Sequence, residues 1–178
     1  DSYSVFNTMR EFILANKLPR TPLVYSLFLS IIEKDNSFVP INISSLFDKF
    51  SDIYLGKLNL FPGIDGTYDY SLKQFLLEEL SKYMIDNNKR YLNISEYNLF
   101  IEEFNRKKGV KVNPKVLLED LIRSNFISFY NNEVRFSFDC FMFFFQAKYI
   151  QRNNKEKLLI ENIDLHKFYN VINFYSGL

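Results

Sequence analysis

Residues 126–138, with the sequence FISFYNNEVRFSF, contain the pattern that decides the fold. Apolar and polar side chains alternate along residues 126–130 and again along 134–138, which predicts two β-strands. The pair Asn131-Asn132 joins them, and asparagine tolerates the left-handed backbone conformation that a tight hairpin requires. The stretch therefore predicts a two-stranded β-hairpin.

Three helical patterns precede this hairpin. The first carries apolar residues from Leu72 to Met84, and a short extended segment leads to Ser95, the predicted N-cap of the second helix. Gly109 follows the second helix where a C′ residue belongs, and Asn113-Pro114 opens the third. Helix, short strand, helix, helix and hairpin is the order of a winged helix.

The N-terminal third is also predicted to be helical. Thr21 can cap a helix that begins at Pro22, because the missing N–H of proline has no helical partner at that position. Asn42 or Ser44 is the expected cap of the next helix, and the proline and glycines of residues 61–67 predict a linker.

These patterns predict a mainly α protein in which a helical subdomain is followed by a winged helix with a short β-hairpin. The expected boundaries are residues 1–62 for the helical subdomain, 63–154 for the winged-helix domain and 155–178 for the start of a further helical region. A helix from Cys140 to about Asn153 is expected to close the winged helix.

Composition restricts the function classes. Among the 178 residues, 47% are hydrophobic and 18% aromatic, which is ample for a packed core. The net charge of +1 provides no overall field to attract nucleic acid or an anionic membrane. The single cysteine fits a reducing compartment, so we expect a cytoplasmic protein that does not contact membranes. The chain begins without Met, and we expect it to be part of a longer protein.

No catalytic site and no metal site are predicted. Gly56, Gly63 and Gly66 lack the spacing of a phosphate-binding loop, and no Gly-Lys-Ser/Thr follows them. The only histidine, His166, and the only cysteine, Cys140, are too few for a metal site without distant carboxylates. We therefore expect no enzymatic activity from this chain. His166 is predicted to be solvated, and Cys140 to pack in the core.

Two further interpretations follow from local pattern. Neighbouring glutamates such as Glu78-Glu79 and Glu102-Glu103 are expected on solvated helix faces, because adjacent residues of a helix do not converge on one point. Phe138, at the end of the second predicted strand, is expected in the core.

A winged helix raises DNA binding as the alternative. The third helix would enter the major groove, but its Lys115 and Arg123 are offset by Glu119 and Asp120. The four cations from Arg106 to Lys111 can supply four phosphate contacts, fewer than tight binding at physiological salt requires. Nucleic acid is therefore not the expected partner. A DNA-binding or protein-interaction module remains the alternative function.

The segment Val134–Ile150 resembles a landmark of the NACHT-type STAND NTPases. In that family the winged helix closes with Phe-x-His-x-x-Phe-x-x-Tyr/Phe-Phe-x-Ala, followed by an aromatic and an aliphatic residue. Residues 18–27 resemble the start of the family's first helical domain, and 171–178 its next helix with an apolar-Gly-Leu end. The matching positions of the landmark are Phe136, Phe141, Phe144, Phe145, Ala147, Tyr149 and Ile150.

The resemblance implies a helical and winged-helix arm that lies C-terminal to a P-loop ATPase core of the same polypeptide. In the family the nucleotide lies between core and arm. The proline at the position of Pro22 packs near the adenine, and the landmark histidine touches the ADP phosphate. Here Phe138 holds the histidine position. A phenyl ring cannot donate to phosphate, so the usual ADP lock is absent or is supplied by another residue.

The expected function is that of a nucleotide-sensing, autoinhibitory fragment of a STAND signalling switch, as in prokaryotic defence or innate immunity. No cofactor is expected within the fragment, whereas ATP or ADP with Mg²⁺ is expected in the full-length protein. The resemblance also implies a homo-oligomer on activation.

Overall fold

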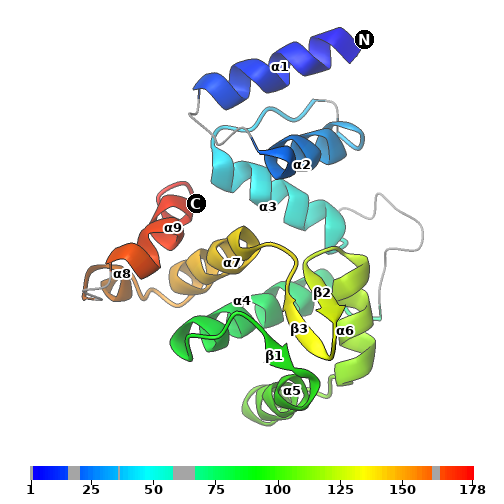
Figure 1. The fold of residues 1–178 in the computed structure, drawn as a ribbon, viewed down its shortest axis with the longest axis vertical. Coiled ribbons are helices and arrows are strands. Elements are labelled where there is room, and N and C mark those ends of the chain that lie inside the picture. Colours follow the sequence, from blue (N-terminus) through cyan, green and yellow to red (C-terminus); the bar gives the residue numbers. More distant parts are fainter. Residues whose placement is uncertain (1, 16–20, 36, 58–66, 162–164) are drawn as a thin grey trace.

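The computed structural model describes residues 2–15, 21–35, 37–57, 67–161 and 165–178 of the chain. These residues form helices and one small antiparallel sheet, which confirms the mainly α class (Figure 1). The helices are α1 (Ser2–Ala15), α2 (Pro22–Ile32), α3 (Ile43–Tyr54), α4 (Tyr70–Asp86), α5 (Ile94–Lys108), α6 (Pro114–Arg123), α7 (Asp139–Arg152), α8 (Lys157–Glu161) and α9 (Leu165–Tyr175). The strands are β1 (Leu92–Asn93), β2 (Ile127–Tyr130) and β3 (Glu133–Phe136).

The predicted order of helix, short strand, helix, helix and hairpin is present as α4, β1, α5, α6, β2 and β3. The strands form an antiparallel sheet in the order β1-β3-β2, in which Val134 lies opposite both Leu92 and Phe129. Asn131 and Asn132 adopt φ values of 49° and 66°, so the hairpin turn has the left-handed conformation that the sequence predicted. The short strand β1 adds a third strand to the hairpin.

Most helix boundaries follow the predicted caps. The Thr21 hydroxyl accepts a hydrogen bond from the amide of Val24 at 3.4 Å, and Pro22 occupies the first position of α2. Gly109 ends α5 with φ of 66°, where glycine avoids the strain of a side chain. Likewise, Asn42 caps α3 and Asn113 caps α6.

The prediction that Ser95 caps α5 is wrong. Asn93 is the N-cap: its side chain accepts from the amide of Glu96 at 2.9 Å, and the Glu96 carboxylate accepts from the amide of Asn93 at 3.0 Å. This reciprocal capping box starts the helix at Ile94, directly after β1. Ser95 is therefore an exposed residue of the first turn.

Helix α7 lies at the centre of the core. It packs along α4 on one side and α9 on another, and it lies between the N-terminal helices and the sheet (Figure 1). Its Phe141 ring meets Phe126 at a centroid distance of 4.9 Å, and its Phe144 ring meets Phe47 of α3 at 5.6 Å. Buried side chains from the three predicted segments join in one continuous cluster.

Some predicted features fall outside the described part of the chain. The predicted linker, apart from its last residue, belongs there, as do Leu18 and Pro19 and the side chain of His166. Among the described residues, no helix combines the length and the apolar character needed to cross a membrane.

Candidate functional site

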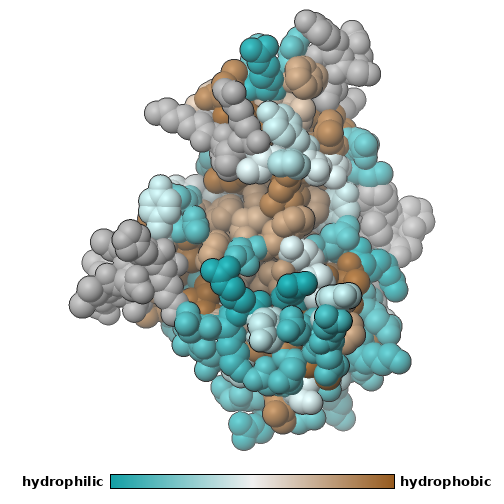
Figure 2. Space-filling model, viewed as in Figure 1, coloured by the Kyte–Doolittle hydropathy of each residue, from teal (hydrophilic) through white to brown (hydrophobic). Residues whose placement is uncertain are grey.

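A groove of about 310 Å³ lies where α2, the C-terminal end of α3 and the start of α7 meet. Figure 2 shows a hydrophobic area in the middle of this face, between α2 and α7 as placed in Figure 1. The groove is lined by Pro22, Leu23, Ser26, Leu27, Ser30, Phe50, Tyr54, Asn125, Phe138 and Phe141.

Pro22 reaches the groove because α2 begins there. Thr21 has an extended backbone and caps the helix, so the chain turns into α2 at an exposed proline. Ser26 and Ser30 follow Pro22 at intervals of four residues and share its face, while Val24 and Phe28 enter the core. The helix therefore presents a small, weakly polar face to the groove.

Phe138, which directly precedes α7, lines the same groove. It is 48% exposed and lies at the N-cap position of α7, where its backbone is extended. The prediction that Phe138 belongs to the core is wrong. β3 ends at Phe136, so the strand alternation does not continue to residue 138, and the buried rings of Phe126 and Phe141 already fill the interior there.

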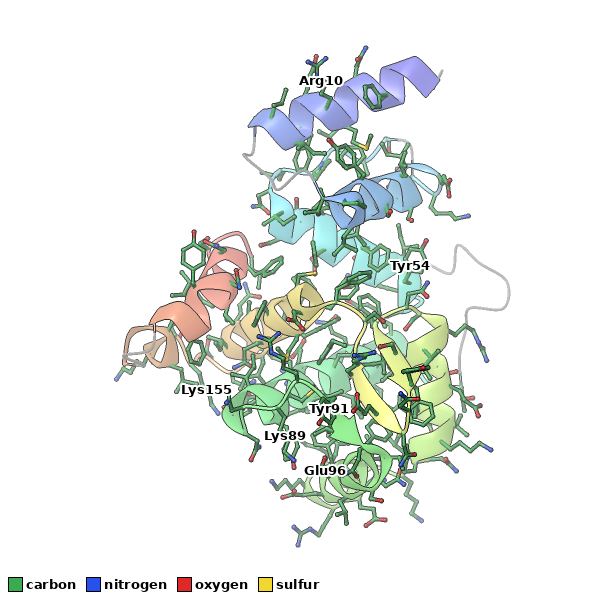
Figure 3. The ribbon with its side chains drawn as sticks, in the orientation of Figure 1. Arg10, Tyr54, Lys89, Tyr91, Glu96 and Lys155 are labelled. Atoms are coloured by element: carbon green, nitrogen blue, oxygen red, sulfur yellow. The ribbon has the colours of Figure 1, made fainter. Side chains whose placement is uncertain are left out.

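Aromatic rings connect the two ends of the groove wall. Tyr54 stacks on Phe50 with centroids 4.3 Å apart, and Phe50 stacks on Phe141 at 5.8 Å. Phe138 meets the edge of Phe141 at 5.9 Å. Figure 3 labels Tyr54 at the end of α3 that faces the sheet. These offset and edge contacts hold flat apolar surfaces in place along the wall.

Asn125 is a groove residue that the sequence interpretation missed. It lies between α6 and β2 with φ of 63°, and its amide donates to the carbonyl of Ile122 at 2.9 Å. An asparagine just after a helix favours this left-handed conformation, so its position in the turn could have been found. Its position in the same groove as Pro22 depends on the tertiary fold, and no sequence pattern near Asn125 indicates it.

The described residues that line the groove carry no charge. Its polar groups are the hydroxyls of Ser26, Ser30 and Tyr54 and the amide of Asn125. An apolar site with a few uncharged polar groups can bind a flat neutral ligand and orient it. These described lining residues include no cation for a phosphate and no acid–base pair.

The structure also corrects the interpretation of Glu78. This residue is 1% exposed, although it was expected on a solvated helix face. The Nε of Arg152 on α7 lies 3.0 Å from its Oε2, and the Gln74 amide donates to its Oε1 at 2.8 Å. Burial raises the pKa of Glu78, while Gln74 and Arg152 act in the opposite direction. The prediction for Glu78 is wrong because α7 covers this part of α4, which the sequence of α4 alone does not indicate.

Cys140 has the surroundings of a packed side chain. Cys140 is half-buried and packs against the core, and burial raises the pKa of its thiol to about 11. The thiol is therefore protonated at neutral pH, when a nucleophile or metal ligand would need the thiolate. The described side chains include no group of three or more histidine, cysteine, aspartate or glutamate residues able to hold a metal ion.

A wider hollow of about 900 Å³ lies beside the end of α4 and the start of β1. Its cations already have partners: Lys89 pairs with Glu96, and Arg90 lies 2.9 Å from Asp139. Figure 3 labels Lys89, Tyr91 and Glu96 in this region. Because these cations are already paired at the surface, the hollow is a weak candidate for a binding site.

The comparisons with known proteins bear on the second half of the chain. Searches of curated proteins and of solved structures give no match. The model of the family described as novel STAND NTPase 4 matches residues 90–146, less than half of the chain. The matched residues run from β1 into α7 and include Phe136, Phe138 and Phe141. This match supports STAND NTPase membership for the protein.

Proposed function

We propose that this chain is the regulatory, nucleotide-sensing arm of a STAND NTPase switch of the NACHT type. In this proposal residues 63–154 form a winged helix, and the groove between α2, α3 and α7 faces the nucleotide. A P-loop ATPase core of the same polypeptide holds that ATP or ADP with Mg²⁺. The arm keeps the switch inactive until a trigger releases it, the activated protein forms a homo-oligomer, and the switch acts in the cytoplasm in defence or immune signalling.

One observation carries this proposal. Pro22 and Phe138 are separated by most of the chain, and the resemblance singled out both as positions that approach bound nucleotide. The fold brings them to one groove, together with Phe50 and Tyr54. The family match, which includes Phe138 but not Pro22, supports the STAND NTPase part of the proposal.

The decisive experiment is Pro22→Ala in the protein that contains the ATPase core. Loss of the rigid apolar face should weaken ADP retention several-fold, since about 1.4 kcal/mol corresponds to a tenfold change. The stability of the arm should change by less than about 1 kcal/mol, because alanine fits the first position of a helix. ADP dissociation and urea unfolding measure the two effects.

Pro114→Ala is the matched control. Pro114 likewise opens a helix, behind the Asn113 cap where Pro22 follows Thr21, but it does not line the groove. It should reproduce any change in helix stability and leave ADP retention unchanged. If Pro22→Ala, Pro114→Ala and the parent protein all retain ADP equally, Pro22 does not contact the nucleotide.

The alternative is a DNA-binding or protein-interaction module. Two cations of the basic stretch are already paired: Lys107 lies 2.7 Å from Glu103, and Lys108 lies 3.3 Å from Glu79. These pairs reduce the charge available to phosphates. Duplex DNA binding tighter than about micromolar at physiological salt would exceed ordinary non-specific affinity and favour the alternative.

A further inference from the structure

We propose that the end of α9 is a latch on α3. The contact between these two helices holds α3, and with it one wall of the groove, against α7. Release of the end of α9 lets α3 open while α4, α5, α6 and the sheet stay folded. The inference concerns the movement of the chain and does not depend on what the groove binds.

Two donors at the start of α3 bind the end of α9. The Ser44 hydroxyl, which is fully buried, donates to the carbonyl of Phe174 at 2.7 Å. The side-chain amide of Asn42 donates to the carbonyl of Gly177 at 3.1 Å. The oxygen of the same Asn42 side chain accepts from the amide of Ser45 at 2.8 Å and so caps α3. The residue that starts α3 therefore also holds the end of α9.

The end of α9 fits this place closely. The Phe174 ring lies 4.9 Å from the ring of Phe47 on α3 and 5.7 Å from that of Phe144 on α7, measured between centroids. A Cβ at Gly177 would lie 2.6 Å from the Ser44 hydroxyl oxygen, so a side chain there requires a shift. Closely packed contacts are either formed or broken and do not stretch continuously. A displacement of α9 therefore breaks the ring contact and both hydrogen bonds together.

Polar groups weaken the attachment of α3 elsewhere. Asp48 of α3 pairs with Lys148 of α7, but the Asp48 side chain is 42% exposed. Ser51 is 1% exposed, and its hydroxyl has no hydrogen-bond partner in the described part of the chain. A partly exposed ion pair adds little stability, and a buried polar group without a partner costs free energy. Beyond the rings of Phe47 and Phe50, which meet Phe141, the contact with α9 is thus a main attachment of α3.

Helix α3 connects the latch to the groove. It has 12 residues, which form one rod about 18 Å long. The donors Asn42 and Ser44 lie at its start, whereas Phe50 and Tyr54 line the groove from its other half. Figure 1 shows α3 running from the side of α9 toward the sheet. Opening at the latch therefore also displaces the wall that α3 gives to the groove.

Native-state hydrogen exchange of the purified chain is the first test. The backbone amides of α3, including those of Phe50 and Tyr54, should share one opening equilibrium with the amides at the end of α9. Their protection should be at least about tenfold lower than that of the slowest amides of α4 and α7, which exchange only by global unfolding. Protection of α3 equal to that of α7 would overturn the latch, as would clearly different protection of α3 and the end of α9.

A reversible lock is the second test. The Cβ of Ser44 lies 3.1 Å from an ideal Cβ at Gly177, slightly less than the roughly 3.5–4.5 Å of a disulfide. In Ser44→Cys/Gly177→Cys, oxidation should raise the protection of α3 to that of α7, and reduction should lower it again about tenfold. The bridge also closes a long loop and stabilises the whole fold, so the ratio of α3 to α7 protection is compared. An equal ratio in both redox states would overturn the latch.

Gly177→Ala tests the same coupling without a bridge. Crowding against Ser44 should lower the protection of α3 and of the end of α9 by one common factor of about tenfold. Ser176→Ala is the matched control, since its exposed hydroxyl bonds only within its own turn, and it should leave both unchanged. A loss of protection confined to α9 would show that α9 opens without α3 and would overturn the inference.

Discussion

Glu78 is a buried carboxylate whose charged form is favoured by the Gln74 hydrogen bond and by the charges of Arg152 and Lys148. Its Oε2 accepts no well-aligned hydrogen bond within the described part of the chain, so it relies on the charge of Arg152 at 3.0 Å. Arg152 also lies over the Phe75 ring, with its guanidinium carbon 4.0 Å from the centroid. The pair joins α4 to the end of α7.

We expect Arg152→Met to destabilise the fold by about 3 kcal/mol at pH 7, because it leaves a buried negative charge without its partner. Methionine retains an unbranched apolar side chain over Phe75. Arg90→Met is the control: Arg90 pairs with Asp139, and the two side chains are 80% and 53% exposed. Loss of an exposed pair should cost about 0.5 kcal/mol or less. Urea unfolding compares the two variants, and equal losses would contradict the interpretation.

The same pair predicts a pH dependence. Burial raises the pKa of Glu78 above its ordinary value of 4.5, so the folded state binds the proton more tightly than the unfolded chain. The contribution of this group to stability therefore increases as the pH falls from neutral through the raised pKa. In Arg152→Met the carboxylate lacks its countercharge, so the deficit relative to the parent should shrink between pH 7 and pH 5. A deficit that stays constant over this range would show that Glu78 is not its cause.

At the scale of elements, the N-terminus of α3 holds the C-terminal end of α9. The Ser44 hydroxyl donates to the carbonyl of Phe174 at 2.7 Å, and the Asn42 amide donates to the carbonyl of Gly177 at 3.1 Å. The Phe174 ring lies against Phe47 with centroids 4.9 Å apart. Donors at the start of α3 thereby bond carbonyls at and just beyond the end of α9, and the Phe174 carbonyl also accepts from the amide of Gly177 at 3.1 Å.

This contact leaves no room for a side chain at position 177. A Cβ on Gly177 would lie 2.6 Å from the Ser44 hydroxyl oxygen. We expect Gly177→Ala to cost about 1–3 kcal/mol through overpacking, and Ser44→Ala about 1 kcal/mol through the lost hydrogen bond.

The double variant should cost less than the sum of the two single variants, because removing the hydroxyl relieves the clash. Thermal unfolding provides the four values of the cycle. Ser176→Ala is the control, since its exposed hydroxyl bonds only within its own turn. Strictly additive losses would mean that Gly177 and Ser44 do not meet in solution.

At the scale of the whole molecule, we expect this chain alone to hydrolyse no ATP. Phosphoryl transfer needs a phosphate cradle and a held Mg²⁺, and its sequence supplies no P-loop. None of the described residues that line the groove has a charged side chain that could replace one. Phosphate release from purified chain should equal that of buffer. Steady turnover that persists through repeated purification would refute this expectation.

The parts of the structure that the sequence predicted are local. The hairpin turn depends on Asn131-Asn132, the start of α2 on Thr21-Pro22, and the end of α5 on Gly109. Each depends on backbone preferences and hydrogen bonds within a few residues, so the order of elements could be predicted without knowing how they pack. The one wrong cap arose where a neighbouring asparagine formed a reciprocal bond with Glu96.

The sequence by itself determined the mainly α class, the order of elements and the positions of most caps, because short-range interactions set them. Only the tertiary structure decided which faces are covered. It buried Glu78 beneath α7, left Phe138 half exposed, and brought Pro22, Asn125 and Phe138 to one groove. Burial and the meeting of distant residues depend on the neighbour that packs against each element, and periodicity along one element does not specify that neighbour.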